Sequence, residues 1–231
     1  LIRGEKGTEV ILKIFRDDEE LPRDVSILRD EINVPSVTWE MKESIGYIRI
    51  IHFQEDTTTK FSEAAQDLIL KNPDGLVIDL RNNPGGYLDR AIEVVSKFIE
   101  NKPAVIEQFA DGRRETYNTS GTPILQGIPT VVLVNAGSAS ASEIVAGALQ
   151  DYGIATILGE TTFGKGSVQD WQGFEDGSSL KITVASWLTP NGRSIDRQGI
   201  DPDVEVKITE EDYAADRDPQ LEKAIEIINT Q

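Results

Sequence analysis

Apolar and polar positions along the chain predict short strands and helices that follow one another in turn. Some stretches are short apolar runs that end in glycine or polar residues, whereas others repeat apolar residues every three or four positions. The runs predict strands at residues 10–16, 45–53, 76–80, 104–109, 131–134, 154–158 and 179–187. The helical repeat predicts helices at residues 61–71, 88–99 and 218–230. Alternation of this kind favours an α/β core with helices packed on a central sheet.

The segment from residue 131 to residue 169 places a serine-rich turn and an isolated lysine in one strand–helix–strand unit. The strand at 131–134 leads into a turn of small residues, and a helical pattern follows with one apolar face: Ile144, Val145, Ala148 and Leu149. The next strand, at 154–158, leads into a glycine-rich loop that carries Lys165. Strand-to-helix turns lift a side chain into solvent and direct backbone N–H groups at a ligand. A serine on such a turn, with a lysine as base, is one known arrangement for acyl transfer.

Three serines share this turn, and the sequence alone does not choose between them. They are Ser138, Ser140 and Ser142. Ser140 and Glu143 also fit a capping box, which would satisfy the free amides at the start of the helix. A purely structural role for Ser140 is therefore an open alternative.

Lys165 has three interpretations. It could be an ordinary solvent-exposed lysine of a loop. Residues 159–165 also fit the phosphate-binding pattern GxxxxGK after a strand, but Gly166 stands where a serine or threonine would hold magnesium, and no helix is predicted beyond it. In the third interpretation the lysine is a general base, which requires a neutral amine and hence burial away from carboxylates. Three apolar neighbours could provide such surroundings: Phe163, Val168 and Trp171.

Composition narrows the classes of function. The formal charge of −17 argues against nucleic acid or an anionic membrane surface as a partner, because both would be repelled. There is no cysteine, which excludes disulfides and thiolate chemistry, and no apolar run approaches the roughly twenty residues of a membrane span. His52 is the single histidine and lies inside a predicted strand, where we expect a structural role. With one histidine, no cysteine and no calcium-loop spacing, we predict no metal site.

Four segments together resemble the carboxyl-terminal processing peptidases, also called tail-specific proteases. In order, they are residues 1–17, 75–86, 131–169 and 188–204. Members of that family are serine endopeptidases with a Ser–Lys pair in place of Ser–His–Asp. The resemblance implies a ClpP/crotonase-like protease core with its preceding linker over residues 18–231, the acidic stretch 17–24 being read as linker. It also implies that residues 1–17 are the C-terminal remnant of a PDZ domain, most of whose peptide groove would lie upstream.

The resemblance also assigns roles to individual residues. It implies that Ser140 is the nucleophile, that Lys165 is the base, and that Gln169 orients the lysine through a hydrogen bond. The N–H groups of Gly86 and Ala141 would form the oxyanion hole. Four further positions would support the turn and the loop: Gly85, Glu143, Asp151 and Thr162.

The resemblance implies protein or peptide substrates with apolar C-termini, no cofactor, and a location outside the cytoplasm, such as the periplasm, cell envelope or thylakoid lumen. A second copy of the chain or an adaptor protein is a further possible partner. Two rival functions stay open at this point. One is a binding module that keeps the fold without catalysis. The other is a conventional hydrolase that uses His52.

Overall fold

The computed structural model describes residues 2–16, 19, 21–32 and 34–230. These residues form two compact units, 1–35 and 36–231, which we describe separately. The first unit is an antiparallel pair of strands, β1 (Glu9–Ile14) and β2 (Arg23–Leu28), in register from Glu9 opposite Leu28 to Ile14 opposite Arg23. Strand β2 begins inside the stretch that we expected to be a linker. The origin of this unit in a PDZ domain stays a prediction.

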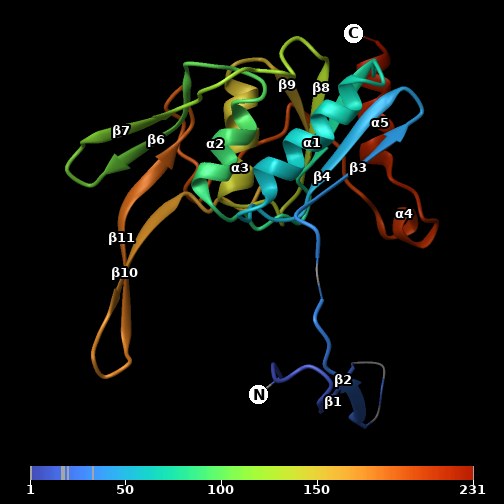
Figure 1. Ribbon diagram of the computed structural model, residues 1–231, viewed down its shortest axis with the longest axis vertical. Coiled ribbons are helices and arrows are strands. Elements are labelled where there is room, and N and C mark those ends of the chain that lie inside the picture. The colour runs from blue at the N-terminus through green and yellow to red at the C-terminus, as the bar shows by residue number, and fades with distance from the viewer. Residues whose placement is uncertain (1, 17–18, 20, 33, 231) are drawn as a thin grey trace. The chain divides into compact units, whose positions relative to one another are not determined.

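The second unit is built on a six-stranded sheet in the order β12-β9-β8-β5-β4-β3. Four of these strands, β9, β8, β4 and β3, are labelled in Figure 1. Neighbouring strands run parallel from β12 to β4, and β3 pairs antiparallel with β4 at one edge of the sheet. The strands are β3 (Val37–Lys42), β4 (Ile45–Ile50), β5 (Gly75–Asp79), β8 (Thr130–Val134), β9 (Ala155–Gly159) and β12 (Val204–Glu205). Because parallel strands end at the same edge, the loops after β4, β5, β8 and β9 gather there.

Helices cover both faces of this sheet (Figure 1). Helices α1 (Thr57–Ile69), α2 (Leu88–Val95) and α3 (Ala141–Asp151) pack on one face, and α5 (Pro219–Asn229) packs on the other; the short helix α4 (Glu210–Ala214) precedes α5. Side chains of β5 alternate between the layers, with Leu76 and Ile78 on the side of α1 to α3 and Val77 on the side of α5. Burial of each such aliphatic side chain contributes about 1.5–3 kcal/mol to the free energy of unfolding. By the same alternation along β5, the side chain of Asp79 faces α5.

A second, antiparallel sheet has the strand order β10-β11-β6-β7. Its members are β6 (Pro103–Phe109), β7 (Arg114–Asn118), β10 (Ser167–Gly173) and β11 (Ser179–Leu188). Within the described residues β10 is an edge strand, and it directly follows the loop that carries Lys165. The second sheet therefore holds one side of that loop.

The predicted α/β core is confirmed, and several boundaries are corrected. The strand predicted at 45–53 ends at Ile50, so His52 lies outside it. The chain leaves the sheet there because Phe53 pairs with the glycine-rich loop: its N–H donates to the Gly85 carbonyl at 3.0 Å and its carbonyl accepts from Tyr87 N at 2.9 Å. The helix predicted at 61–71 begins earlier and ends at residue 69, and the one predicted at 88–99 ends at residue 95.

Candidate active site

Ser140 occupies a strained turn between strand β8 and helix α3. It is the N-cap of α3, with φ 56° and ψ −113°. A non-glycine residue rarely adopts positive φ, and such strain persists where the surrounding structure enforces it. Ser140 and Glu143 form the capping box expected from the sequence: the Ser140 side chain faces the Glu143 N–H, and Ser140 N donates to Glu143 Oε2 at 2.7 Å. The hydroxyl proton of Ser140 is donated to no described residue. The hydroxyl is therefore free to react.

The neighbouring serines have structural roles instead. The hydroxyl of Ser138 is fully buried, donates to the Leu80 carbonyl at 2.8 Å and accepts from Asn135 N at 3.0 Å. The hydroxyl of Ser142 is also fully buried and donates to the Asn83 carbonyl at 2.9 Å. These two serines fasten the turn to the loop after β5, whereas Ser140, which is partly exposed, has no such bond.

The glycine pair of the loop after β5 lies against the Ser140 turn. A Cβ atom placed on Gly85 would lie 2.8 Å from Ser140 Cβ and 3.0 Å from Ala141 N, so only glycine fits there. Gly85 and Gly86 have φ of 101° and 146°, a region open mainly to glycine. A Cβ on Gly86 would meet the Phe53 carbonyl oxygen at 2.1 Å. Close contact with the Ser140 turn on one side and with Phe53 on the other therefore fixes this loop beside the serine.

Among the described residues, one backbone N–H group of the serine turn and one of the glycine loop lack a hydrogen-bond partner. Neither the N–H of Ala141 nor that of Gly86 makes a hydrogen bond within the described part of the chain. Gly86 also lines an open depression of ≈ 460 Å³, together with His52 and Tyr87. Free N–H groups beside a nucleophile are what an oxyanion hole requires.

Glu143 joins the serine turn to the lysine loop. Its carboxylate is fully buried and accepts four hydrogen bonds. One oxygen accepts from Thr162 Oγ1 and Gly164 N, each at 2.6 Å, and the other accepts from Ser140 N at 2.7 Å and Lys165 N at 2.9 Å. The backbones of the serine and the lysine are thus bound to the same oxygen atom.

The lysine loop is held on its other side by the segment at 195–199. Gly164 O accepts from Arg197 N at 2.9 Å, and a Cβ on Gly166 would lie 2.1 Å from Asp196 N. Thr162 Oγ1 accepts from Ile200 N at 2.7 Å, which ties the same segment to Glu143. The backbone around Lys165 is therefore well supported.

The Lys165 side chain itself is exposed, and no hydrogen bond joins it to Ser140 or Gln169 within the described residues. Of the three apolar neighbours expected from the sequence, Phe163 and Trp171 are 66% and 62% exposed, and Val168 is half-buried, so they do not enclose the lysine. The loop leads into β10, which is an edge strand among the described residues, so no further strand pairs beyond it on that side. Gln169 is also exposed and follows a bulge in β10.

Asp151 lies at the opposite end of α3 from Ser140. Its buried carboxylate binds Arg193, with Oδ1 to Nη2 at 2.5 Å, and accepts from Asn191 N at 2.7 Å. It therefore fixes the loop after β11 rather than the turn that carries Ser140. Its support of the site is indirect, because that loop continues into the segment behind Lys165.

Comparison with known proteins assigns the family. The family model described as "Peptidase family S41" matches residues 44–206, which is more than half of the chain. A probable CtpA-like serine protease of Staphylococcus aureus is 42% identical over 210 residues, covering 89% of this chain and 41% of that protein. This chain belongs to peptidase family S41. The resemblance to the carboxyl-terminal processing peptidases is thereby confirmed.

Solved structures agree with this S41 fold. The structure titled photosystem II D1 C-terminal processing protease has a TM-score of 0.74 and 32% identity, covering 88% of this chain and 57% of that one. Mature CPAF, at 16% identity and a TM-score of 0.67, supports the fold alone. The S41 chain spans less than half the length of the curated relatives it matches.

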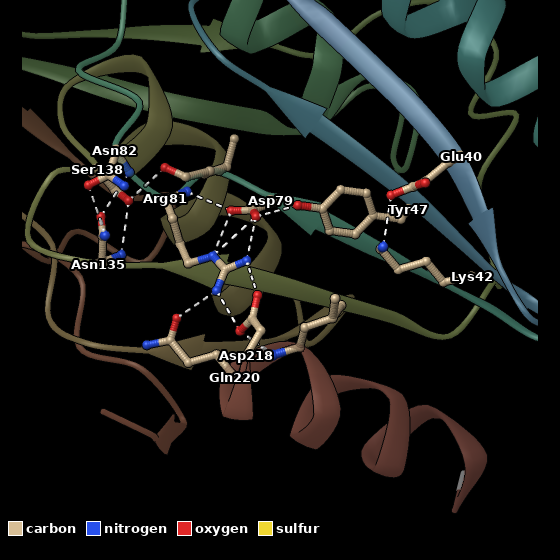
Figure 2. A network of polar contacts seen from close by, with 12 residues as sticks. Glu40, Lys42, Tyr47, Asp79, Arg81, Asn82, Asn135, Ser138, Asp218 and Gln220 are labelled. Atoms are coloured by element: carbon tan, nitrogen blue, oxygen red, sulfur yellow. Dashed lines mark hydrogen bonds and ion pairs between the residues drawn. The ribbon is translucent and has the colours of Figure 1, made fainter. Parts of the chain in front are cut away.

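A second polar cluster of this S41 chain, which sequence reasoning missed, surrounds Arg81 next to the glycine loop (Figure 2). Burial alone would lower the pKa of Arg81, but the carboxylates of Asp79 and Asp218 hold it above its ordinary value. Burial would raise the pKa of Asp218, but Arg81 holds it below the usual range. The Arg81–Asp218 pair therefore stabilises the fold at neutral pH, and this contribution is lost as pH falls through the lowered pKa.

Within the described residues, histidine and acidic side chains form no group of three or more that could hold a metal ion. None of the helices in the described part of the chain has the length and apolar character needed to cross a membrane.

Proposed function

We propose that this chain is the protease core of a carboxyl-terminal processing serine peptidase, with Ser140 as nucleophile and Lys165 as base. The observation that carries the proposal is the free Ser140 hydroxyl at positive φ, flanked by the unpaired N–H groups of Ala141 and Gly86. Membership of family S41 and similarity to the D1 C-terminal processing protease support it. Cleavage of an unfolded protein by the wild-type chain, and its loss in Ser140→Ala, tests it.

The proposed reaction forms and then hydrolyses an acyl-enzyme. Ser140 Oγ attacks the carbonyl carbon of the substrate while its proton passes to neutral Lys165 Nζ. The N–H groups of Ala141 and Gly86 stabilise the negative oxygen of the tetrahedral intermediate. Collapse breaks the C–N bond, and the leaving amine takes the proton from Lys165. Water then gives a proton to Lys165 as its oxygen attacks the ester carbon. Collapse breaks the bond between that carbon and Ser140 Oγ, and Lys165 returns the proton to Oγ as the acid is released.

Desolvation of Lys165 in this proposal comes from the substrate. The side chain is exposed in the free chain, whereas a lysine serves as a general base where water is excluded from its amine. A peptide laid over the loop, in contact with exposed Phe163, would exclude water from the amine. Gln169 would then orient the lysine as the resemblance implies. The backbone positions needed for this are already bound to Glu143.

Substrate class, partners and compartment are parts of the same proposal. Membership of family S41 and similarity to the D1 C-terminal processing protease support protein substrates, and the preference for apolar C-termini stays a prediction. A second copy or an adaptor protein as partner, and a location outside the cytoplasm, stay predictions. So does the assignment of residues 1–17 to a PDZ domain.

We predict that this chain alone discriminates poorly between substrate tails. Recognition by strand addition needs a sheet edge together with a loop that binds the terminal carboxylate. The described part of residues 1–35 contains the two-stranded pair β1–β2 and no larger sheet. Two fluorogenic peptides that differ only in an apolar or a charged last residue should be cleaved with kcat/KM values within about threefold. A difference above about thirtyfold would show that residues 36–231 read the tail themselves.

We predict that His52→Gln retains catalysis. His52 lines the same depression as Gly86, so the rival mechanism, in which this histidine is the base, is tested by replacing it. If neutral Lys165 is the base, the variant should cleave with a rise in kcat/KM towards alkaline pH that parallels the wild type. Loss of cleavage by a folded His52→Gln chain would favour the histidine-dependent rival.

A further inference from the structure

The guanidinium group of Arg81 connects its own loop to strand β5 and to the start of helix α5 (Figure 2). It binds Asp79 at the end of β5, with Nη2 to Oδ2 at 2.7 Å and Nε to Oδ1 at 3.0 Å. It binds Asp218 through Nη1 and Nη2, both at 2.9 Å, and Gln220 Oε1 at 3.1 Å. The side chains of Arg81 and Asp79 are 11% and 2% exposed, so water screens this pair weakly.

Asp218 is the N-cap of the C-terminal helix α5. Its Oδ1 accepts from Leu221 N at 3.0 Å while the carboxylate also holds Arg81. Gln220, in the first turn of α5, donates to the Val206 carbonyl at 2.7 Å. Both α5 contacts to Arg81 therefore come from a helix terminus whose own position is fixed.

Arg81 is also the second residue of the loop that runs from Leu80 to Gly86. The next residue, Asn82, has φ 59° and exchanges two hydrogen bonds with Asn135: its N–H donates to Asn135 Oδ1 at 2.9 Å, and Asn135 Nδ2 donates to its Oδ1 at 3.0 Å. Asn135 Oδ1 accepts also from Gly137 N, in the turn that leads to Ser140. The chain of contacts thus runs from α5 through Arg81 to both sides of the candidate oxyanion hole.

We propose that the Arg81–Asp218 pair is a clamp through which helix α5 positions the oxyanion loop, so that Arg81 is a positioning residue for catalysis. The inference rests on the proposed function. A rigid loop matters because oxyanion donors act only when they already point at the developing charge. Weakening the clamp lets residues 81–86 relax, which moves the Gly86 N–H without removing any group that touches the substrate.

The test is Asp218→Asn, compared with wild type on a fluorogenic peptide. Asparagine caps a helix as well as aspartate, and Asp79 still neutralises Arg81, so the variant should fold. We expect kcat to fall about 10- to 100-fold with KM within about twofold, the size of effect produced by a misplaced oxyanion donor. A fluorophosphonate probe, whose phosphoryl oxygen occupies the same hole, should label Ser140 more slowly by the same factor.

A second variant and a matched control complete the test. Arg81→Lys keeps the charge but cannot bind both carboxylates with a planar fork, and should lose at least as much kcat. Asp212→Asn makes the same change in helix α4, where the carboxylate pairs with Arg217 at 2.7 Å and accepts from Thr209 N, and it should keep kcat within twofold.

The outcomes separate the inference from the proposed function. Unchanged kcat and labelling in folded Asp218→Asn and Arg81→Lys would overturn the clamp while leaving the peptidase assignment intact. An equal loss in Asp212→Asn would also overturn it, because the effect would then follow general destabilisation. Absence of both cleavage and labelling in the wild-type chain would overturn the proposed function and the clamp with it.

Discussion

Ser140→Ala should abolish peptide-bond cleavage while leaving the fold intact. The Ser140 hydroxyl donates to no described residue, and the Glu143 N–H that faces it in the capping box also donates to the Ser140 carbonyl at 2.9 Å, so removal of the hydroxyl leaves no buried partner unsatisfied. We expect a loss of at least roughly 10⁴-fold in kcat, because a nucleophile and its base act as one unit. Lys165→Ala should lose as much, and the double variant little more. Turnover of an unfolded protein substrate, with circular dichroism as the check on folding, measures this.

The neighbouring serines provide the matched controls for this prediction. Ser138→Ala removes two buried hydrogen bonds and should lower the free energy of unfolding by about 1–3 kcal/mol. Ser142→Ala removes one hydrogen bond and should lower the free energy of unfolding by less, because the Asn83 carbonyl still accepts from Ala139 N at 3.0 Å. Both should keep far more activity than Ser140→Ala. Activity in Ser140→Ala together with a dead but folded Ser138→Ala would refute the choice of nucleophile.

Glu143→Gln should lower kcat more than about 100-fold and should also lower the free energy of unfolding. The carboxylate accepts four hydrogen bonds, and an amide keeps one accepting oxygen. The amide NH₂ would face Thr162 Oγ1, which can rotate to accept, and Gly164 N, which cannot. A buried N–H left without a partner costs about 1–3 kcal/mol and displaces the lysine loop.

Thermal unfolding and kcat together measure the Glu143 effect. The control is Glu160→Gln, which makes the same change in charge at the start of the lysine loop, where the carboxylate accepts no hydrogen bond from the described residues. It should match the wild type in both measurements. Wild-type turnover by folded Glu143→Gln would show that the link between the two backbones does not govern catalysis.

Much of the fold was predictable because it depends on local alternation. Leu76, Val77 and Ile78 face alternate layers of the core, as a buried strand between two helix layers requires. Strands β3 and β10 were not predicted, since both lie at sheet edges where polar positions interrupt the apolar pattern. The strand end at Ile50 was missed because the pairing of Phe53 with the glycine loop is a distant contact.

The candidate site was predictable in its residue types but not in its contacts. The sequence did not distinguish Ser140 from Ser138 and Ser142; the distinction comes from which hydroxyls the loop after β5 binds. The link between Arg81 and Asp218 joins positions that are 137 residues apart, and no local pattern marks such a pair. Exposure of Lys165 was likewise invisible, because burial depends on which elements cover the loop.

The most direct measurement of the central claim is the mass and position of a covalent adduct. The chain is treated with a fluorophosphonate probe, and intact mass and peptide mapping locate the modification. The proposal predicts one adduct per chain, on Ser140, absent from Ser140→Ala and strongly slowed in Lys165→Ala. An adduct on Ser138 or Ser142, or cleavage that persists in Ser140→Ala without any adduct, would contradict the assignment of Ser140 as the nucleophile.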